Sequence, residues 1–161
     1  MQRALTFVMI LSFWLQPAWA KSPIVGDLAP PFSITSLEGE KLSLDDLKGK
    51  VILIGMFHIC VPCQIQALEF EKVRQAVSSD KLVIIGINTA GDSKKDVKEY
   101  LAGFPTPIHF PYYLDPEQTV HKAYLQRDMP TVLIIGPDGK LLARSPSVGA
   151  TQLVPYINKL L

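Results

Sequence analysis

The sequence predicts an α/β sandwich, in which helices flank a central mixed β-sheet. The main observation is a set of three continuous apolar runs, residues 51–57, 82–87 and 131–135. Their length and their β-branched residues are typical of strands buried on both faces, as in a parallel sheet. Segments with helical spacing separate the runs, and a hairpin and a helix close the chain. The length of 161 residues suits one domain, and the sequence shows no internal repeat or linker.

The first twenty residues have the pattern of a secretory signal peptide. Arg3 gives a positive start, Ala4–Leu15 is an apolar run, and Ala18–Ala20 has small residues at the positions that a signal peptidase reads. The run is shorter than the ~20 apolar residues that cross a bilayer comfortably. Cleavage after this tripeptide leaves residues 21–161 as the mature domain. The alternative is an uncleaved N-terminal membrane anchor, and both interpretations place the domain outside the cytoplasm.

The composition excludes several classes of protein. Charged residues make up 19% and the net charge is +1, so no basic excess points to nucleic acid and no acidic excess points to a solvating tail. Removing the signal peptide takes away Arg3 and no acidic residue, which leaves a neutral mature chain. Two cysteines allow at most one bridge within the chain, so the protein is not a disulfide-dense scaffold. We expect a monomer.

The N-terminal half is predicted to begin with extended structure. Glu38-Gly39 is a turn signal between two short strand-like segments, which predicts an N-terminal β-hairpin. Beyond Cys63, apolar residues recur with helical spacing and charged residues lie between them. In chain order we expect a lead-in, a hairpin, a buried strand and a helix: residues 21–31, 32–34 with 41–44, 51–57, and from Cys63 onward.

The C-terminal half alternates strands and helices. Ser93 and Gly103 are start and stop signals of one helix, and Asp115 with Pro116 marks the start of a shorter one. Pro137-Asp138-Gly139 is a tight turn between two strands. In chain order we expect a strand, a helix, an extended segment, a short helix, two strands and a last helix: residues 82–87, 93–102, 108–114, 116–124, 131–135, 141–144 and 151–161.

The sharpest chemical motif is Cys60-Val61-Pro62-Cys63, between a buried strand and a helix. A spacing of three residues puts both sulfurs on one side of a helical turn. The unpaired N–H groups and partial positive charge of the helix N-terminus favour a thiolate at Cys60, which could attack a disulfide while Cys63 resolves the product. A purely stabilising disulfide is the alternative, but so short a loop gives little chain entropy. With two cysteines, a closed Cys₄ zinc site within one chain is excluded.

Two further features have two interpretations each. Met129-Pro130-Thr131 precedes the third apolar run, and its proline is either an ordinary start of a strand or a cis proline. The residues alone favour the ordinary start. His58 could favour a thiolate or act as a ligand, but a packed or surface histidine is the favoured interpretation.

From about Val25 to Leu161, the chain resembles the TlpA/ResA-like branch of the thioredoxin superfamily, which is related to the AhpC/TSA proteins. The resemblance implies a thioredoxin-like sandwich and an extracytoplasmic thiol–disulfide oxidoreductase without cofactor or bound metal. Five segments, in matching order and spacing, carry it: Gly26–Phe32, Leu47–Lys50 with the strand that leads to Cys60–Cys63, Gly86–Asn88, Met129–Thr131 and Pro137–Lys140.

The resemblance also implies roles for five residues. Cys60 would be the nucleophile and Cys63 the resolving thiol. Pro130 would be a cis proline that shapes the substrate groove and keeps metals from the cysteines. The backbone of Met129, with Thr131 beside it, would pair with an extended substrate segment.

The chain departs from the family where a proton acceptor for Cys63 is expected. Ile54 stands where thioredoxins bury an aspartate, and Gln66 stands where this branch often has a glutamate. Glu69 is a weak substitute, because we expect it to face solvent. The proton acceptor is therefore unassigned.

The expected function is that of a periplasmic reductant of protein disulfides, for example in cytochrome c maturation or in the reduction of copper-site cysteines. Its partners would be disulfide-bearing proteins and a membrane electron donor. One alternative is a Cu(I) metallochaperone with His58, Cys60, Cys63 and His121 as ligands, although copper chaperones on this fold have a wider cysteine spacing. A peroxiredoxin-like peroxidase is disfavoured, because Phe57 stands where such sites have threonine or serine. The intact cysteine pair disfavours a redox-inactive binding module.

Overall fold

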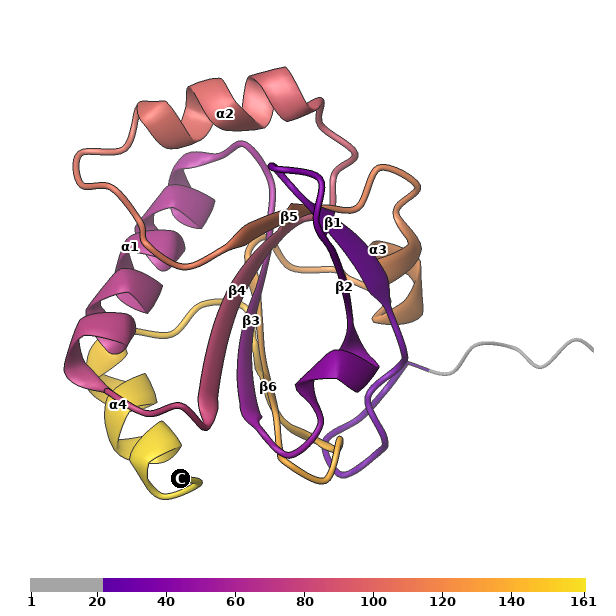
Figure 1. The fold of residues 1–161 in the computed structure, drawn as a ribbon, viewed down its shortest axis with the longest axis vertical. Coiled ribbons are helices and arrows are strands. Elements are labelled where there is room, and N and C mark those ends of the chain that lie inside the picture. Colours follow the sequence, from indigo (N-terminus) through magenta and orange to yellow (C-terminus); the bar gives the residue numbers. More distant parts are fainter. Residues whose placement is uncertain (1–21) are drawn as a thin grey trace, which may run out of the picture.

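The computed structural model describes residues 22–161, which form a mixed β-sheet with helices on both faces (Figure 1). The strands are β1 (Ser33–Ser36), β2 (Lys41–Ser43), β3 (Val51–Phe57), β4 (Leu82–Asn88), β5 (Tyr112–Leu114), β6 (Thr131–Ile135) and β7 (Leu141–Ser145). The helices are η1 (Leu44–Leu47), α1 (Val61–Ala76), α2 (Lys94–Ala102), α3 (Thr119–Ala123) and α4 (Ala150–Asn158). The predicted α/β sandwich is confirmed. The predicted signal peptide lies outside the described residues, and none of the helices in residues 22–161 is long and apolar enough to span a membrane.

The sheet has seven strands in the order β2-β1-β5-β4-β3-β6-β7. β4 is parallel to both β3 and β5, whereas β6 is antiparallel to both β3 and β7. β1 pairs antiparallel with β2 and with β5. β3 is therefore an interior strand, between β4 and β6, and the cysteine motif lies in the segment that follows it.

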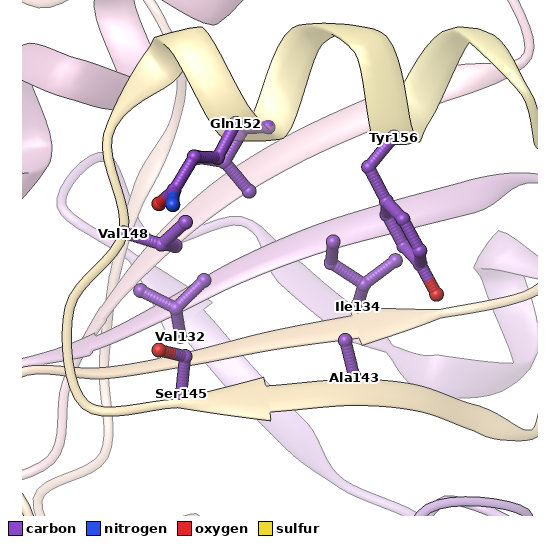
Figure 2. A pocket seen from close by; sticks show the side chains of 8 residues that line it. Val132, Ile134, Ala143, Ser145, Val148, Gln152 and Tyr156 are labelled. Carbon is purple, nitrogen blue, oxygen red and sulfur yellow. The ribbon is translucent and has the colours of Figure 1, made fainter.

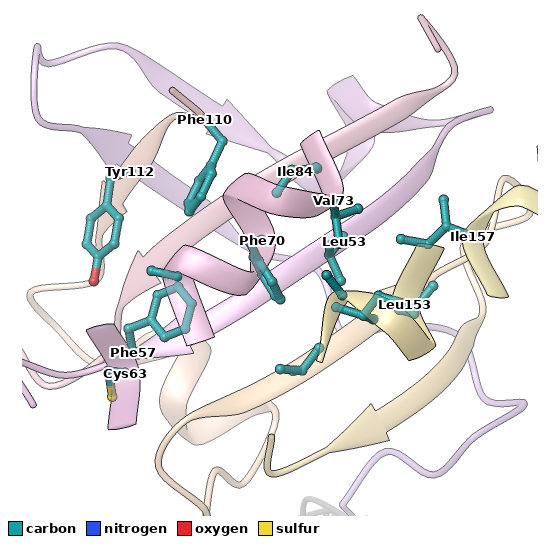
Figure 3. Packing of buried hydrophobic residues seen from close by; sticks show 14 of the residues in the cluster. Leu53, Phe57, Cys63, Phe70, Val73, Ile84, Phe110, Tyr112, Leu153 and Ile157 are labelled. Atoms are coloured by element: carbon teal, nitrogen blue, oxygen red, sulfur yellow. The ribbon is translucent and has the colours of Figure 1, made fainter. Parts of the chain in front are cut away.

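Two apolar clusters, one on each face, explain why β3 is a continuous apolar run. Leu53 and Phe57 belong to the cluster beneath α1 and α4, which Figure 3 shows. Ile54 and Met56 belong to the cluster on the other face, together with residues of η1 and α3. Because successive side chains of a strand point to opposite faces, a strand covered on both faces needs an apolar residue at every position.

A pair of glycines makes room for Phe57, the last residue of β3. Gly55 and Gly86 are opposite each other in the β3–β4 register. A Cβ atom at Gly86 would lie 2.7 Å from the ring of Tyr112, and one at Gly55 would overlap the ring of Phe57. The rings of Phe57 and Tyr112 stack, with centroids 6.0 Å apart. These close approaches fix the end of β3, from which the cysteine motif continues.

The short helix α3 begins later than the sequence predicts. Asp115, which is 3% exposed, accepts hydrogen bonds from the backbone N–H groups of Thr119 (2.8 Å) and Val120 (2.9 Å). Gln118 has left-handed backbone angles, with φ 55°. The N-cap residue is Gln118 and not Asp115 as expected, although the Asp115 carboxylate bonds the first N–H groups of α3 across the intervening turn; Pro116 is therefore not the first helical residue.

Candidate active site

Cys60 and Cys63 form a disulfide where β3 ends and α1 begins, with their Cα atoms 5.3 Å apart. Cys60 is the N-cap residue of α1, and its Sγ accepts a hydrogen bond from the backbone N–H of Cys63 at 3.2 Å. Pro62 lies in the first turn of the helix, where the missing N–H is of no consequence. The motif therefore occupies the helix N-terminus that the sequence predicts for it.

The two sulfur-bearing residues differ in exposure. Cys63 is 1% exposed and belongs to the cluster beneath α1 (Figure 3), whereas Cys60 is half-buried. The backbone N–H of His58 donates to Cys63 Sγ at 3.3 Å, which holds this sulfur on the inner side of the turn. A partner molecule of any size therefore meets Cys60 first.

The environment of Cys60 is suited to an anionic sulfur. The first turn of α1 contains no acidic residue, and the helix N-terminus presents unpaired N–H groups and a partial positive charge. Both features favour thiolate over thiol when the disulfide is opened. The arrangement can therefore supply a nucleophile at the surface and a second, buried sulfur within bonding reach of it.

Met129 and Pro130 lie at the same end of the sheet as the disulfide, because Thr131 is opposite Met56 in the β3–β6 register. The Met129–Pro130 peptide bond is cis, as the family resemblance implies and the residues alone did not favour. Pro130 is buried and Met129 half-buried. Thr131 is fully buried and its hydroxyl donates to the Asp128 carbonyl at 2.7 Å, so its side chain supports this loop and does not face a partner.

A buried amide that sequence reasoning missed connects this loop to β3. Gln126, 7% exposed, donates through Nε2 to the carbonyls of Met56 and Asp128, both at 3.2 Å, and to the sulfur of Met129 at 3.3 Å. Its Oε1 accepts a hydrogen bond of 2.5 Å from the hydroxyl of Thr89. Gln126 thus fixes the position of the Met129 loop relative to β3, the strand that precedes the cysteines. Its partners are distant in sequence, and no motif signals them.

His58 is a packed histidine. Its Nε2 atom is buried and has no hydrogen-bond partner within residues 22–161, and the same holds for Nδ1 of His121. Burial lowers the pKa of His58 below its usual value, although the nearby carboxylate of Asp92 opposes this shift. A neutral imidazole adds no positive charge beside the cysteines. His109 lies elsewhere, against Glu71 in the second half of α1.

Glu69, the weak substitute proton acceptor for Cys63, and Gln66, which stands where the family often has a glutamate, are both bonded elsewhere. Gln66 is 1% exposed, and its amide bonds both the carbonyl (2.8 Å) and the N–H (2.9 Å) of Val148. Glu69 does not face solvent as expected, since its side chain is 22% exposed and accepts the N–H of Ala150 at 2.7 Å. That bond and a contact with Lys72 lower the pKa of Glu69. Both side chains fix the start of α4 against α1.

A metal site and a cavity are two other candidate places for chemistry. Among the described residues, no group of three or more histidine, cysteine and acidic side chains is arranged to hold a metal ion. An apolar cavity of about 290 Å³ lies between β6, β7 and α4 (Figure 2). Ser145 and Gln152 are polar residues in its lining, which includes neither cysteine. This cavity is separate from the disulfide.

Comparison with known proteins yields one family and several relatives. The model of the AhpC/TSA family matches residues 25–144. The chain is 29% identical over 118 residues to the thiol-disulfide oxidoreductase ResA of Bacillus subtilis. This match covers 73% of this chain and 64% of ResA. It is 32% identical over 117 residues to the thioredoxin-like protein YneN of the same species, and this match covers 71% of this chain and 66% of YneN. The matches thus span slightly less than two thirds of the length of these relatives.

A comparison of structures gives the same fold. The thioredoxin domain of a thiol-disulfide oxidoreductase from Bacteroides vulgatus has a TM-score of 0.74 with this chain, at 22% identity. The match covers 86% of this chain and 98% of the other. At this identity the similarity supports the fold alone, and the fold is that of thioredoxin.

Proposed function

The chain belongs to the AhpC/TSA family, and from this premise we propose that it is a thiol–disulfide oxidoreductase of the ResA type whose reactive couple is Cys60 and Cys63. The observation that carries the proposal is the asymmetry of the pair. An accessible Cys60 caps a helix and is bonded to a Cys63 that is buried in the core. The comparisons agree with the resemblance that the sequence motifs indicate.

The reaction starts from the dithiol form. The Cys60 thiolate attacks one sulfur of a partner disulfide, forms a mixed disulfide and displaces the other partner sulfur as a thiolate, which takes up a proton. Cys63, having lost its proton to solvent or to the partner, then attacks Cys60 Sγ. This step releases the second partner thiol and closes the Cys60–Cys63 disulfide. Two electrons pass to the partner, and a separate reductant must return them before the next cycle.

The surface around Cys60 supports a polypeptide as substrate. Ile59 and Val61 are next to Cys60 in the sequence, Ile65 lies two residues beyond Cys63 on α1, and the three are 41%, 67% and 56% exposed. No residue from 59 to 68 carries a charge. Exposed aliphatic side chains beside a reactive sulfur fit an apolar polypeptide segment better than a small charged thiol. The backbone of Met129 would pair with that segment as an added strand, and buried Pro130 would shape the groove.

The cellular setting that we propose is the periplasm. The signal-peptide pattern of residues 1–20 supports export, and hence a periplasmic protein or one held by an uncleaved anchor. Because an oxidising compartment does not regenerate dithiols, a membrane electron donor would have to re-reduce a protein that acts as a reductant there. We propose that the protein acts as a monomer.

Trapping the mixed disulfide tests this function. In the Cys63→Ser variant, Cys60 should bond covalently to a disulfide-bearing polypeptide and stay bonded, because the resolving thiol is missing. The matched Cys60→Ser variant retains only the buried Cys63 and should form no such adduct. Mass mapping after acid quenching identifies the bonded cysteine. Equal trapping by both variants, or trapping by neither, would contradict the proposal.

A further inference from the structure

The active-site turn receives a hydrogen bond from a helix that the cysteine chemistry does not otherwise involve. The hydroxyl of Tyr100, on α2, donates to the backbone carbonyl of Cys60 at 2.7 Å. The two residues are 40 positions apart in sequence. Figure 1 shows α2 lying across the end of the molecule where α1 begins.

The Cys60 carbonyl has a second donor, the backbone N–H of Gln64 at 3.0 Å, which is part of the first helical turn. The Tyr100 hydroxyl, which belongs to α2, is therefore a contact from outside α1 to the N-cap residue of α1. Its ring is held in place, because it meets the ring of Phe104 edge-on, with centroids 4.9 Å apart. Burial raises the pKa of Tyr100 to about 12, so the hydroxyl remains a donor throughout the pH range in which a cysteine thiol titrates.

We propose that Tyr100 is a positioning residue, which holds Cys60 at the N-cap so that its sulfur stays directed at the free N–H groups of α1. The inference rests on the proposed function, since it concerns the reactivity of Cys60. Two physical effects follow from the bond. It keeps Cys60 Sγ in reach of the Cys63 N–H, which lies 3.2 Å away. It also draws negative charge from a carbonyl oxygen that belongs to the same residue as the thiolate.

Both effects favour the thiolate of Cys60 over the thiol. Without the hydroxyl, the N-cap residue is held by its own helix alone, and the carbonyl dipole is less compensated. The pKa of the Cys60 thiol should then rise, and its reaction with electrophiles at neutral pH should slow. A net hydrogen bond is worth a roughly threefold to tenfold change in an equilibrium, which sets the size of the expected effect.

The test is the pH dependence of Cys60 alkylation by iodoacetamide in the reduced protein, with mass mapping to separate Cys60 from Cys63. In Tyr100→Phe the ring and its contact with Phe104 are kept. The rate at pH 7 should fall roughly threefold to tenfold, with a matching rise in the apparent pKa. Tyr124→Phe is the matched control, because the Tyr124 hydroxyl donates to the Pro30 carbonyl at 2.8 Å and its loss should leave the profile unchanged.

A second variant separates the hydroxyl from the packing of α2. Phe104→Leu loosens the ring contact but retains the Tyr100 hydroxyl, so its alkylation profile should shift less than that of Tyr100→Phe. An unchanged profile in Tyr100→Phe, or an equal shift in Phe104→Leu, would overturn the positioning role. Exchange of the natural, reduced protein with a protein disulfide is measured alongside. If this exchange occurs while the alkylation profile of Tyr100→Phe is unchanged, only the positioning role fails. Absence of exchange contradicts the proposed function itself.

Discussion

The two halves of α1 place reactive groups in opposite settings. At its N-terminus, Cys60 is half-buried, its neighbours are exposed aliphatic side chains, and residues 59–68 carry no charge. In its second half, the carboxylate of Glu71 is 3% exposed and is bonded by three other residues. The first end leaves a reactive atom open to a partner, whereas the second satisfies a charge completely within the protein.

Glu71 shows how a buried charge is stabilised on this helix. Arg74 bonds it through Nε and Nη2, the latter at 2.8 Å, and His109 bonds it through its backbone N–H and Nδ1, both at 2.9 Å. Burial alone would raise the pKa of Glu71, but the bonds from Arg74 and His109 outweigh it and lower the pKa to about 2. The cluster thereby connects α1 to the segment before β5. Its role is structural, and it contains no group that exchanges electrons.

The largest expected effect is the loss of this charge. Glu71→Gln should lower the free energy of unfolding by about 2–4 kcal/mol at pH 7, because it removes the buried member of a hydrogen-bonded ion pair. Urea denaturation measures the loss. If the two ends of α1 have separate tasks, the rate of disulfide exchange of the folded variant should be unchanged. A large loss of exchange rate would break the distinction between them.

The same group predicts the acid response of the natural protein. A carboxylate with a lowered pKa in the folded state stabilises the fold above its unfolded pKa of 4.5, and this contribution is lost as the pH falls toward 2. Urea midpoints should therefore drop between pH 4.5 and 2 in the natural protein. The drop should be smaller in Glu71→Gln, and an equal drop in both proteins would contradict the assignment to Glu71.

A carboxylate introduced at Gln66, between the two ends of α1, should lower the free energy of unfolding. In Gln66→Glu, one carboxylate oxygen replaces the amide nitrogen that donates to the Val148 carbonyl, so two acceptors face each other in a buried site. We expect a loss of about 1–3 kcal/mol at pH 7. Because burial raises the pKa of such a carboxyl group, the penalty should disappear as the pH falls below the unfolded glutamate value of 4.5. A penalty that is equal at pH 7 and pH 4 would refute this explanation.

A smaller effect on stability is expected at the loop that faces the cysteines. Gln126→Leu removes the donor shared by the carbonyls of Met56 and Asp128 and should cost about 1–2 kcal/mol. If the Met129 loop binds substrate, the rate with a protein disulfide should fall further than the rate with glutathione disulfide. Stopped-flow measurements with both oxidants compare the two rates. Equal falls would remove the loop from substrate recognition.

The smallest change in stability is expected at the exposed aliphatic side chains. Ile65→Asp should alter the free energy of unfolding by less than about 0.5 kcal/mol, because the site is on the surface. It should nevertheless slow the reduction of a protein disulfide several-fold while leaving the rate with glutathione disulfide nearly unchanged. The matched Ile65→Ala variant should show a weaker effect of the same sign. If Ile65→Asp reacts with protein substrates at the natural rate, this surface does not contact them.

The parts of the fold that could be predicted are those with strong local patterns. β3 and β6 coincide with their predicted residues, and β4 extends one residue beyond its prediction, because strands covered on both faces require continuous apolar runs. The cysteine motif at the start of α1 was also visible, since its spacing and position are local. The start of α3 was predicted too early, because the capping bonds of Asp115 span a turn around the left-handed Gln118.

The remainder of the site consists of contacts between distant residues. Tyr100 meets Cys60, Gln126 meets Met56, and Gln66 meets Val148 across 40, 70 and 82 positions of sequence. A single sequence gives no sign of such pairs, because a buried polar residue cannot be told from a solvent-exposed one by its local sequence. Burial and partner identity follow only from the packing of the sheet and helices around it.

The most direct test of the central claim is the reduction potential of the Cys60–Cys63 couple. The protein is equilibrated in thiol–disulfide buffers of defined potential, and its thiols are trapped and counted by mass. An exchange-active reductant should open reversibly at a potential near that of thioredoxin, about −270 mV. A pair that stays closed well below about −300 mV would behave as a structural disulfide and would contradict the account.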